Sequence, residues 1–238
     1  MAGLDGGRLG PAPRRDPARY PGDRLAFDFL LRGDRIDPLP VDPAPVLDGR
    51  HAVVAFGSNA APAQLAAKFG SATGTIAVTR ARLTGFAVGH SPHVSSPGYM
   101  PWVLVAAPGS RVDCALLWLD DRQRAVLDAT EPNYVLVPID RRRHPLDGST
   151  AVAALSYAAY RGRWGALRWP GEDRPARATS QARLFGRLRT LAWFRDLVGD
   201  GGPRAAQGRL AGDPGLRNRI RAELMAREMT VPDGWSTA

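Results

Sequence analysis

The chain has 238 residues, a hydrophobic content of 44% and a formal net charge of +9 at pH 7. This composition is typical of a globular protein, and it contains neither an apolar run of the roughly 20 residues that span a membrane nor the apolar stretch of a secretory signal. A single cysteine, Cys114, excludes an internal disulfide and favours a reducing cytoplasm. We therefore expect a cytoplasmic protein without a membrane partner, in which Cys114 is a buried, inert thiol.

The positive charge does not by itself indicate nucleic-acid binding. Lys68 is the only lysine, and the other basic residues are arginines spread along the chain among aspartates and glycines. The densest cluster, Arg141–Arg143, has no interleaved aromatic residues that could stack on bases. Nucleic acid is therefore not an expected partner; binding that weakens steeply with added salt would be the sign of that least favoured alternative.

The first fifty residues carry little periodic signal. Residues 1–24 are rich in Gly, Pro, Arg and Asp, which predicts a mobile tail. Leu25–Leu31 is apolar enough to dock on the rest of the protein, and Asp37–Asp48 is a Pro/Asp-rich connector. We expect residues 1–50 to form a Pro/Gly-rich N-terminal extension rather than a domain.

A strand, a tight turn and a helix start follow at residues 51–69. The run His51–Phe56 predicts a strand buried on both faces, and Pro62 suits the first position of a helix that continues through Gln64–Phe69. Backbone N–H groups converge at Gly57–Asn59, where the helix dipole favours negative charge. The turn is a candidate site for a carboxylate or an oxyanion, although most such junctions only change the chain direction.

Short strands dominate the chain as far as residue 160. Strand-like runs follow at Thr75–Gly89, Trp102–Ala107, Val112–Leu119, Tyr134–Ile139 and Ala151–Tyr160. Gly85 predicts a bulge in the first of them, and Pro108–Ser110 predicts a hairpin turn between the second and third. With the two short helices between them, these strands predict a mostly antiparallel or mixed sheet, closed into a small barrel over residues 51–160.

Asp120–Glu131 predicts the second short helix. Asp120 and Gln123 form a capping-box pattern, and Pro132 ends the helix. Leu127 and Glu131 are four residues apart, so the carboxylate shares a face with a core-facing side chain. Taken alone, a glutamate at a helix end is more often exposed to solvent.

The last part of the chain, residues 161–238, predicts a helical extension. Ser180–Val198 and Leu216–Met229 have helical spacing, and Gly199–Gly215 is a Gly/Pro-rich break between them. A loop, residues 162–175, precedes these helices, and Val231–Ala238 is a tail. The helices could cover a pocket or form the interface of a homodimer.

Four motifs in sequence order resemble the gamma-glutamylcyclotransferase-like superfamily, which includes the AIG2-like proteins. Ala55–Asn59 resembles the YGSN loop of the family, Leu83–Phe86 its L-x-G-[FYW] strand, Pro108–Val112 its PGS-x-V sequence, and Leu127–Glu131 with Tyr134 its LD-x-x-E…Y element. The resemblance covers residues 51–140. It implies an α+β fold with a small mixed β-barrel and flanking helices.

The resemblance also implies a reaction and its residues. The catalytic acid/base would be Glu131, and the substrate-binding residues would be Phe56, Gly57, Ser58, Asn59, Ala60 and Tyr134. The α-amine of a gamma-glutamyl amine or peptide would attack its own gamma-carbonyl and release 5-oxoproline. This chemistry needs no cofactor and no metal.

The sequence departs from the family pattern at three positions. Phe56 stands where the family has tyrosine, Ala60 where it has leucine or methionine, and Pro132 where it has glycine. The alternative is therefore a non-catalytic member of the fold that binds a small carboxylate ligand or a protein partner. His90 and His93 are close in sequence, but no third residue has the spacing of a metal ligand, so a metal site is not expected.

Overall fold

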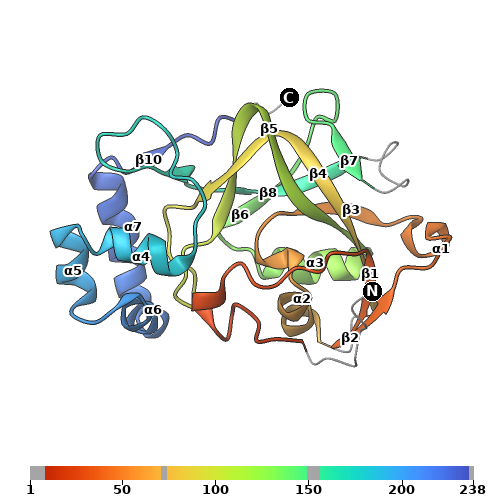
Figure 1. Cartoon of the computed structure of the whole chain (residues 1–238), viewed down its shortest axis with the longest axis horizontal. Helices are drawn as coiled ribbons and strands as arrows, with labels where there is room; N and C mark the ends of the chain where they lie inside the picture. The colour runs from red at the N-terminus through yellow and green to blue at the C-terminus, as the bar shows by residue number, and fades with distance from the viewer. Residues whose placement is uncertain (1–8, 71–73, 149–155, 236–238) are drawn as a thin grey trace.

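The described part of the molecule has a mixed β-sheet with helices packed on it and, beside the sheet, a group of helices from the C-terminal part of the chain (Figure 1). The computed structural model describes residues 9–70, 74–148 and 156–235. The strands of the main sheet are β1 (Phe29–Arg32), β2 (Arg35–Pro38), β3 (His51–Ala55), β4 (Thr75–His90), β5 (Trp102–Leu119), β6 (Tyr134–Pro138), β7 (Leu146–Gly148) and β8 (Tyr157–Gly162). The helices are α1 (Ala44–Leu47), α2 (Pro62–Phe69), α3 (Asp121–Ala129), α4 (Gln181–Leu188), α5 (Ala192–Val198), α6 (Pro203–Gly212) and α7 (Pro214–Ala226), with 3₁₀ turns η1 (Pro17–Arg19) and η2 (Ser58–Ala60).

The main sheet has the strand order β2-β1-β4-β5-β3-β8-β6, and β7 pairs with β4. The pair β3–β8 is parallel and the other pairs are antiparallel. The predicted α+β class with a mixed sheet is therefore confirmed. Among the described strands the path runs open from β2 to β6, so closure into a barrel stays a prediction. A small second sheet joins β9 (Ala166–Leu167) to β10 (Thr230–Val231).

Strand β3 is buried on both faces, as its apolar run predicts. Successive side chains of a strand point to opposite faces of the sheet. Val53 packs with Leu65 and Leu127 beside helices α2 and α3, whereas Val54 packs with Trp118 in the core on the other face. The turn that follows β3 is therefore anchored to a rigid element.

The prediction of a hairpin at Pro108–Ser110 is wrong, because β5 is one strand. Both of its halves pair with β4, with Arg111 opposite Thr84 and Ala106 opposite Phe86. Residues 107–110 therefore form a bulge that bends the strand without reversing it. The bulge lies opposite Gly85, whose φ of +87° favours glycine.

The N-terminal segment is part of the structure from residue 9 onwards, where a mobile tail was expected. Tyr20 is 4% exposed, and the backbone N–H of Arg14 donates to Gln64 Oε1 of α2 at 3.2 Å. Further along, β1 pairs with β4. These contacts all join residues that are distant in sequence, so no local pattern in the sequence predicts them.

The C-terminal helices differ from their predicted bounds. The predicted helix Ser180–Val198 divides into α4 and α5 at Thr190, whose hydroxyl donates to the carbonyl of Arg187 at 2.8 Å. Helix α6 occupies the predicted break, because burying Ala206 and Leu210 outweighs the low helix propensity of its glycines. The predicted strand Ala151–Tyr160 lies partly outside the described residues, and β8 begins at Tyr157.

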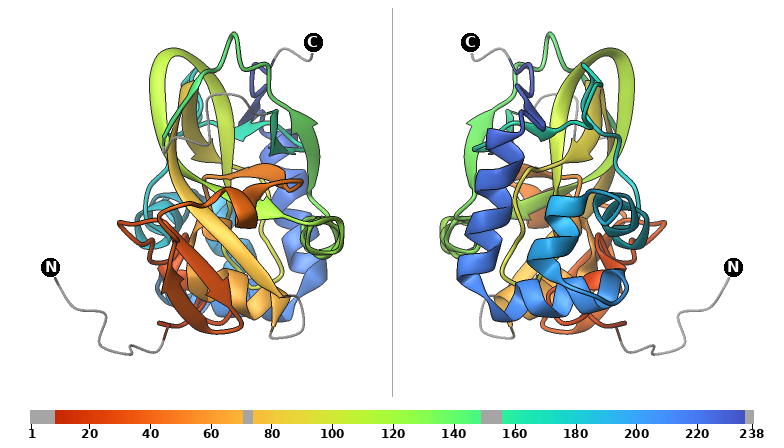
Figure 2. Two further views of the ribbon diagram at one scale, coloured as in Figure 1. Left: turned by 90° about the vertical axis from the view of Figure 1, so that its right-hand side faces the viewer. Right: turned by 90° about the vertical axis from the view of Figure 1, so that its left-hand side faces the viewer.

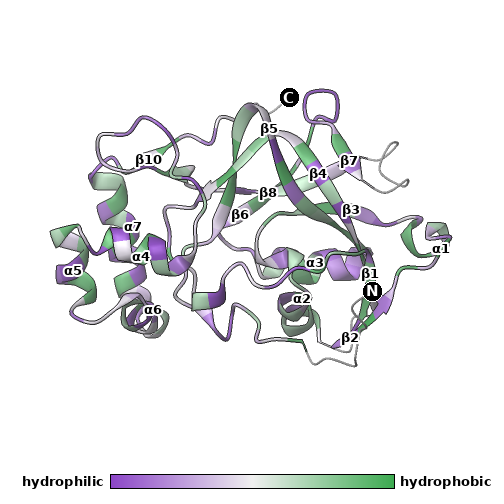
Figure 3. Ribbon diagram, in the orientation of Figure 1, coloured by the Kyte–Doolittle hydropathy of each residue, from purple (hydrophilic) through white to green (hydrophobic). Residues whose placement is uncertain are grey.

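The helices α4–α7 lie together (Figure 2), and their buried side chains form a core with residues from outside the helices, such as Met100 and Trp169. Hydrophobic and hydrophilic residues alternate around the helices, as expected for helices packed on one side (Figure 3). None of the helices that the structure describes has the length and apolar character needed to cross a membrane.

Candidate active site

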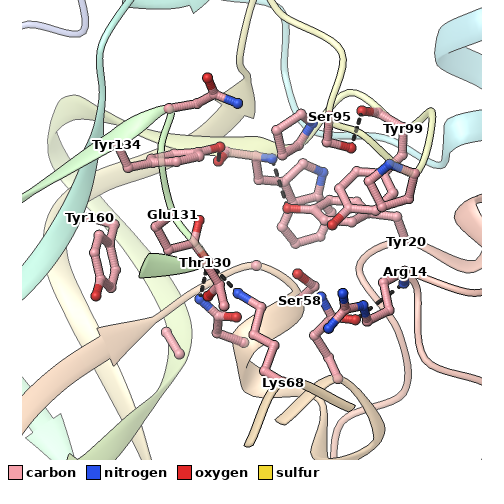
Figure 4. Close-up of a pocket in the computed structure, with 18 of the residues that line it drawn as sticks. Arg14, Tyr20, Ser58, Lys68, Ser95, Tyr99, Thr130, Glu131, Tyr134 and Tyr160 are labelled. Atoms are coloured by element: carbon pink, nitrogen blue, oxygen red, sulfur yellow. Dashed lines mark hydrogen bonds and ion pairs between the residues drawn. The ribbon is translucent and has the colours of Figure 1, made fainter. Parts of the chain in front are cut away.

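A cavity of about 400 Å³ lies where the turn after β3, the helix α2 and the chain after α3 meet (Figure 4). Its walls include residues from the N-terminal segment, the β4–β5 loop and β8 as well. The polar and aromatic side chains on its walls include Arg14, Tyr20, Ser58, Asn59, Lys68, His93, Tyr99, Trp102, Glu131 and Tyr134. Five segments that are far apart in the sequence thus contribute to one site.

Helix α3 places Glu131 on the cavity wall. The predicted capping box is present: Asp120 Oδ1 accepts from the N–H of Gln123 at 2.8 Å, and Gln123 Oε1 accepts from the N–H of Asp120 at 3.1 Å. Leu127, on the same helix, is fully buried. The helix ends at Ala129, and the side chain of Glu131, two residues later, is 15% exposed. Glu131 therefore faces the cavity rather than bulk solvent.

Two side chains hold the Glu131 carboxylate. Asn59 Nδ2 donates to Glu131 Oε1 at 2.9 Å, and Lys68 Nζ donates to the same oxygen at 2.5 Å. Lys68 belongs to the last turn of α2, and its side chain is only 7% exposed. Lys68 is not among the site residues that the sequence predicts. The available signal was that the only lysine of the chain lies nine residues after Asn59, on the helix that begins at the turn.

The turn after β3 has the form predicted for it. Its internal bonds run from the N–H of Ala60 to the carbonyl of Gly57 and from the N–H of Ala61 to the carbonyl of Ser58, at 3.1 and 3.0 Å. The N–H groups of Ser58 and Asn59 have no partner within the turn, as is usual at the start of a helical segment. Both residues line the cavity.

Two of the predicted substrate-binding residues, Phe56 and Ala60, lie in different environments. Phe56 lies on the cavity wall, whereas Ala60 does not. Ala60 is 3% exposed and packs with Leu65 in the core beside α2. The structure therefore places Ala60 in the core, away from the cavity wall where the other predicted substrate-binding residues lie.

Aromatic residues form the opposite wall. Tyr134 donates its hydroxyl to the carbonyl of Trp102 at 2.9 Å, and the N–H of Trp102 donates to the hydroxyl of Tyr20 at 2.8 Å. Tyr20 stacks on Tyr99 with a ring separation of 4.3 Å. A Cβ atom on Gly57 would lie 2.7 Å from the Tyr20 hydroxyl. Tyr20 thus brings a hydroxyl to the turn from the N-terminal segment, beside Phe56, which has none.

Burial keeps these tyrosines protonated. It raises the pKa of Tyr20 and of Tyr134, and together with the nearby Glu131 charge it raises the pKa of Tyr99 to about 12. All three hydroxyls are therefore neutral at physiological pH and can donate hydrogen bonds.

His93 is a neutral residue of the same cavity. Burial lowers its pKa to about 3, and its Nδ1 lies 2.5 Å from Ser91 Oγ. His93 Nε2, Asn59 Oδ1 and Trp102 Nε1 are buried and have no hydrogen-bond partner among the described residues. The wall of the cavity therefore carries polar atoms that the described chain leaves unsatisfied.

Neither a metal centre nor a reactive thiol is evident in the part of the chain that the structure describes. No group of three or more His, Cys, Asp or Glu side chains is placed to hold a metal ion among the described residues. His90 accepts from the N–H of Thr179 at 3.0 Å. Cys114 is buried in β5, and burial raises the pKa of its thiol to about 12, which favours the unreactive thiol form.

Comparison with known proteins adds little to this geometry. No protein-family model and no curated protein sequence matches the chain. The solution structure of an Arabidopsis thaliana protein matches with a TM-score of 0.37 and 17% identity, over 62% of this chain and 81% of that one. A similarity of this size supports no conclusion about family or function.

Proposed function

We propose that the chain is a gamma-glutamylcyclotransferase-like enzyme, with the small mixed barrel of that family, which releases 5-oxoproline from a gamma-glutamyl amine or peptide. One observation carries the proposal. The Glu131 carboxylate and the Gly57–Asn59 turn, which come from separate motifs, meet in one cavity and are joined by the 2.9 Å bond from Asn59 to Glu131. A base beside a set of backbone donors is what intramolecular aminolysis requires.

In the proposed reaction, the α-amine of the substrate attacks its gamma-carbonyl carbon and a C–N bond forms. Glu131 takes the proton that the amine loses. The carbonyl oxygen, now negative, faces the N–H groups of Ser58 and Asn59. The bond to the leaving amine then breaks, and Glu131 returns the proton to that amine. The cavity contributes further by holding the flexible glutamyl chain in a folded, attacking geometry.

Release of 5-oxoproline from a panel of gamma-glutamyl amino acids, peptides and amines tests the proposal. Glu131→Gln should lower the rate by about 10²- to 10⁴-fold, the usual contribution of an acid/base group. Glu223→Gln is the matched control and should keep the wild-type rate, because Glu223 is a partly exposed glutamate of α7 that pairs with Arg227 and lies outside the cavity. Turnover that survives in Glu131→Gln would show that the base is another residue.

A second candidate is a non-catalytic protein that binds a small carboxylate ligand. Two observations favour it: Lys68 occupies Glu131 Oε1, and Phe56 lacks the hydroxyl of the family tyrosine. Binding of 5-oxoproline measured by calorimetry, with no turnover of any member of the panel, would support this alternative over the enzyme.

A further inference from the structure

Lys68 has more hydrogen-bond donors than the described chain satisfies. An ammonium group has three N–H donors. The only acceptor that Lys68 Nζ has among the described residues is Glu131 Oε1, although the side chain is 7% exposed. Buried donors without acceptors are costly, and they are unusual outside functional sites. The free donors lie at the cavity that Lys68 lines.

Unused acceptors lie beside these donors. Asn59 Oδ1 is buried without a partner among the described residues, and its own Nδ2 is bound to Glu131. Both hydrogen bonds of the Glu131 carboxylate end on Oε1, and none to Oε2 is found among the described residues. The site thus offers a cation with spare donors next to two oxygens that can accept.

We propose that Lys68 receives the α-carboxylate of the substrate, so that the cavity takes ligands with a free α-amino acid head group. The carboxylate accepts from Lys68, and the neighbouring α-amine donates to Asn59 Oδ1 and Glu131 Oε2. This inference rests on the proposed function, and it makes Lys68 the residue that selects gamma-glutamyl compounds over amides that lack the α-carboxylate.

Arg14 is the other cation among the described residues that line the cavity, but it fits this role less well. Its Nη1 donates to the carbonyl of Ala67 at 3.0 Å, and the residue is exposed at the rim. An exposed charge is screened by water and salt, whereas the buried Lys68 ammonium attracts an anion more strongly. Lys68 is also next to the proposed base. A substrate carboxylate on Lys68 would compete with Glu131 for the ammonium and free the Glu131 carboxylate to take a proton.

Binding of two small amides tests the proposal. L-Glutamine is the smallest gamma-glutamyl amide, and 4-aminobutanamide is the same molecule without the α-carboxylate. Calorimetry on the Glu131→Gln protein measures binding in the absence of the proposed base. We expect L-glutamine to bind about 10- to 100-fold more tightly than 4-aminobutanamide, the effect of one charge-assisted hydrogen bond.

The double variant Lys68→Met/Glu131→Gln should bind the two amides equally. It removes both charges of the buried pair, whereas Lys68→Met alone would leave the Glu131 carboxylate without its cation. Arg122→Met in the Glu131→Gln background removes an exposed charge from α3 and should keep the preference for L-glutamine.

Several outcomes would overturn the proposal. They are equal affinity for the two amides in Glu131→Gln, a preference that survives in the double variant, a preference that is lost in Arg14→Met instead, and no binding of either amide. The two proposals can fail separately. If the wild type releases 5-oxoproline but the two amides bind equally well, only the role of Lys68 is overturned. If L-glutamine binds more tightly in a Lys68-dependent way but no 5-oxoproline is released, only the proposed enzyme is overturned.

Discussion

The two ends of the chain lie outside the motifs, yet they contribute to the cavity in different ways. The N-terminal segment enters it directly: Arg14 and Tyr20 line the wall, and the Arg24 guanidinium donates to the carbonyl of Phe56. The C-terminal helices do not, because no described residue beyond Tyr160 lines the cavity. The expectation that these helices could cover the pocket is therefore not met by their described residues.

The helices act on the cavity through the β4–β5 loop. Gln181 of α4 accepts from the N–H of Met100 and donates to its carbonyl, both at 2.9 Å. The same loop brings His93 and Tyr99 to the cavity, and at Gly98 it passes so close to the carbonyl of Gln207 that a Cβ atom would lie 2.3 Å away. The N-terminal segment supplies side chains to the cavity directly. The C-terminal helices instead hold the β4–β5 loop in place, and that loop supplies His93 and Tyr99.

The largest effect should come from the core of the helices. Phe194 is fully buried and packs edge to face on Phe185, so Phe194→Ala should lower the free energy of unfolding by about 3–5 kcal/mol. Because Phe194 does not line the cavity, ligand affinity of the folded protein should stay unchanged. Denaturant unfolding and calorimetry measure the two quantities, with the exposed Met225→Ala as control. If Phe194→Ala lowered ligand affinity without lowering the free energy of unfolding, the helix core would not have the purely structural role expected of it.

Removing the hydrogen bonds between α4 and the β4–β5 loop should lower both the free energy of unfolding and the ligand affinity. Gln181→Ala leaves the N–H and the carbonyl of Met100 unpaired in a buried position, at a cost of about 2 kcal/mol in unfolding free energy. It should also weaken ligand binding, since the loop is no longer fixed. Arg183→Ala, an exposed change on the same helix, is the control. Unchanged affinity in Gln181→Ala would show that the loop holds its shape without the helices.

Acid should destabilise the loop region. Burial lowers the pKa of His93 to about 3 and that of His90 to about 4, whereas an unfolded histidine titrates near 6.5. Between about pH 4 and 6.5 the unfolded chain therefore binds more protons, and stability rises with pH by up to about 1.4 kcal/mol per unit for each histidine. His93→Gln should flatten this dependence in pH-resolved denaturation. An unchanged slope would mean that His93 is protonated in the folded state.

The smallest effect on stability should come from the N-terminal segment. Tyr20→Phe removes the acceptor of the Trp102 N–H but keeps the ring that stacks on Tyr99, so it should cost about 1 kcal/mol. Its effect on 5-oxoproline release should exceed its effect on stability, because the hydroxyl lies beside Gly57 in the cavity. A wild-type rate in Tyr20→Phe would limit this segment to a structural role.

Local signals predicted much of the sheet and of the candidate site. The β3 strand, the helix start at Pro62, the capping box at Asp120 and the bulge at Gly85 each depend on neighbouring residues, and each is present. Such features are set by steric and hydrogen-bonding preferences within a few residues. The sequence predicts Glu131 on the same helical face as Leu127, but it lies two residues beyond the end of α3, so its place on the cavity wall also depends on the chain after the helix.

Tertiary structure alone decided which residues complete the cavity. Lys68 meets Glu131 across 63 positions of sequence, and Tyr20 meets Trp102 across 82. Helix α6 forms through two glycines because its apolar side chains are buried by α4, α5 and α7. No local period encodes such contacts, since their free energy comes from desolvation and pairing between segments that only the folded chain brings together.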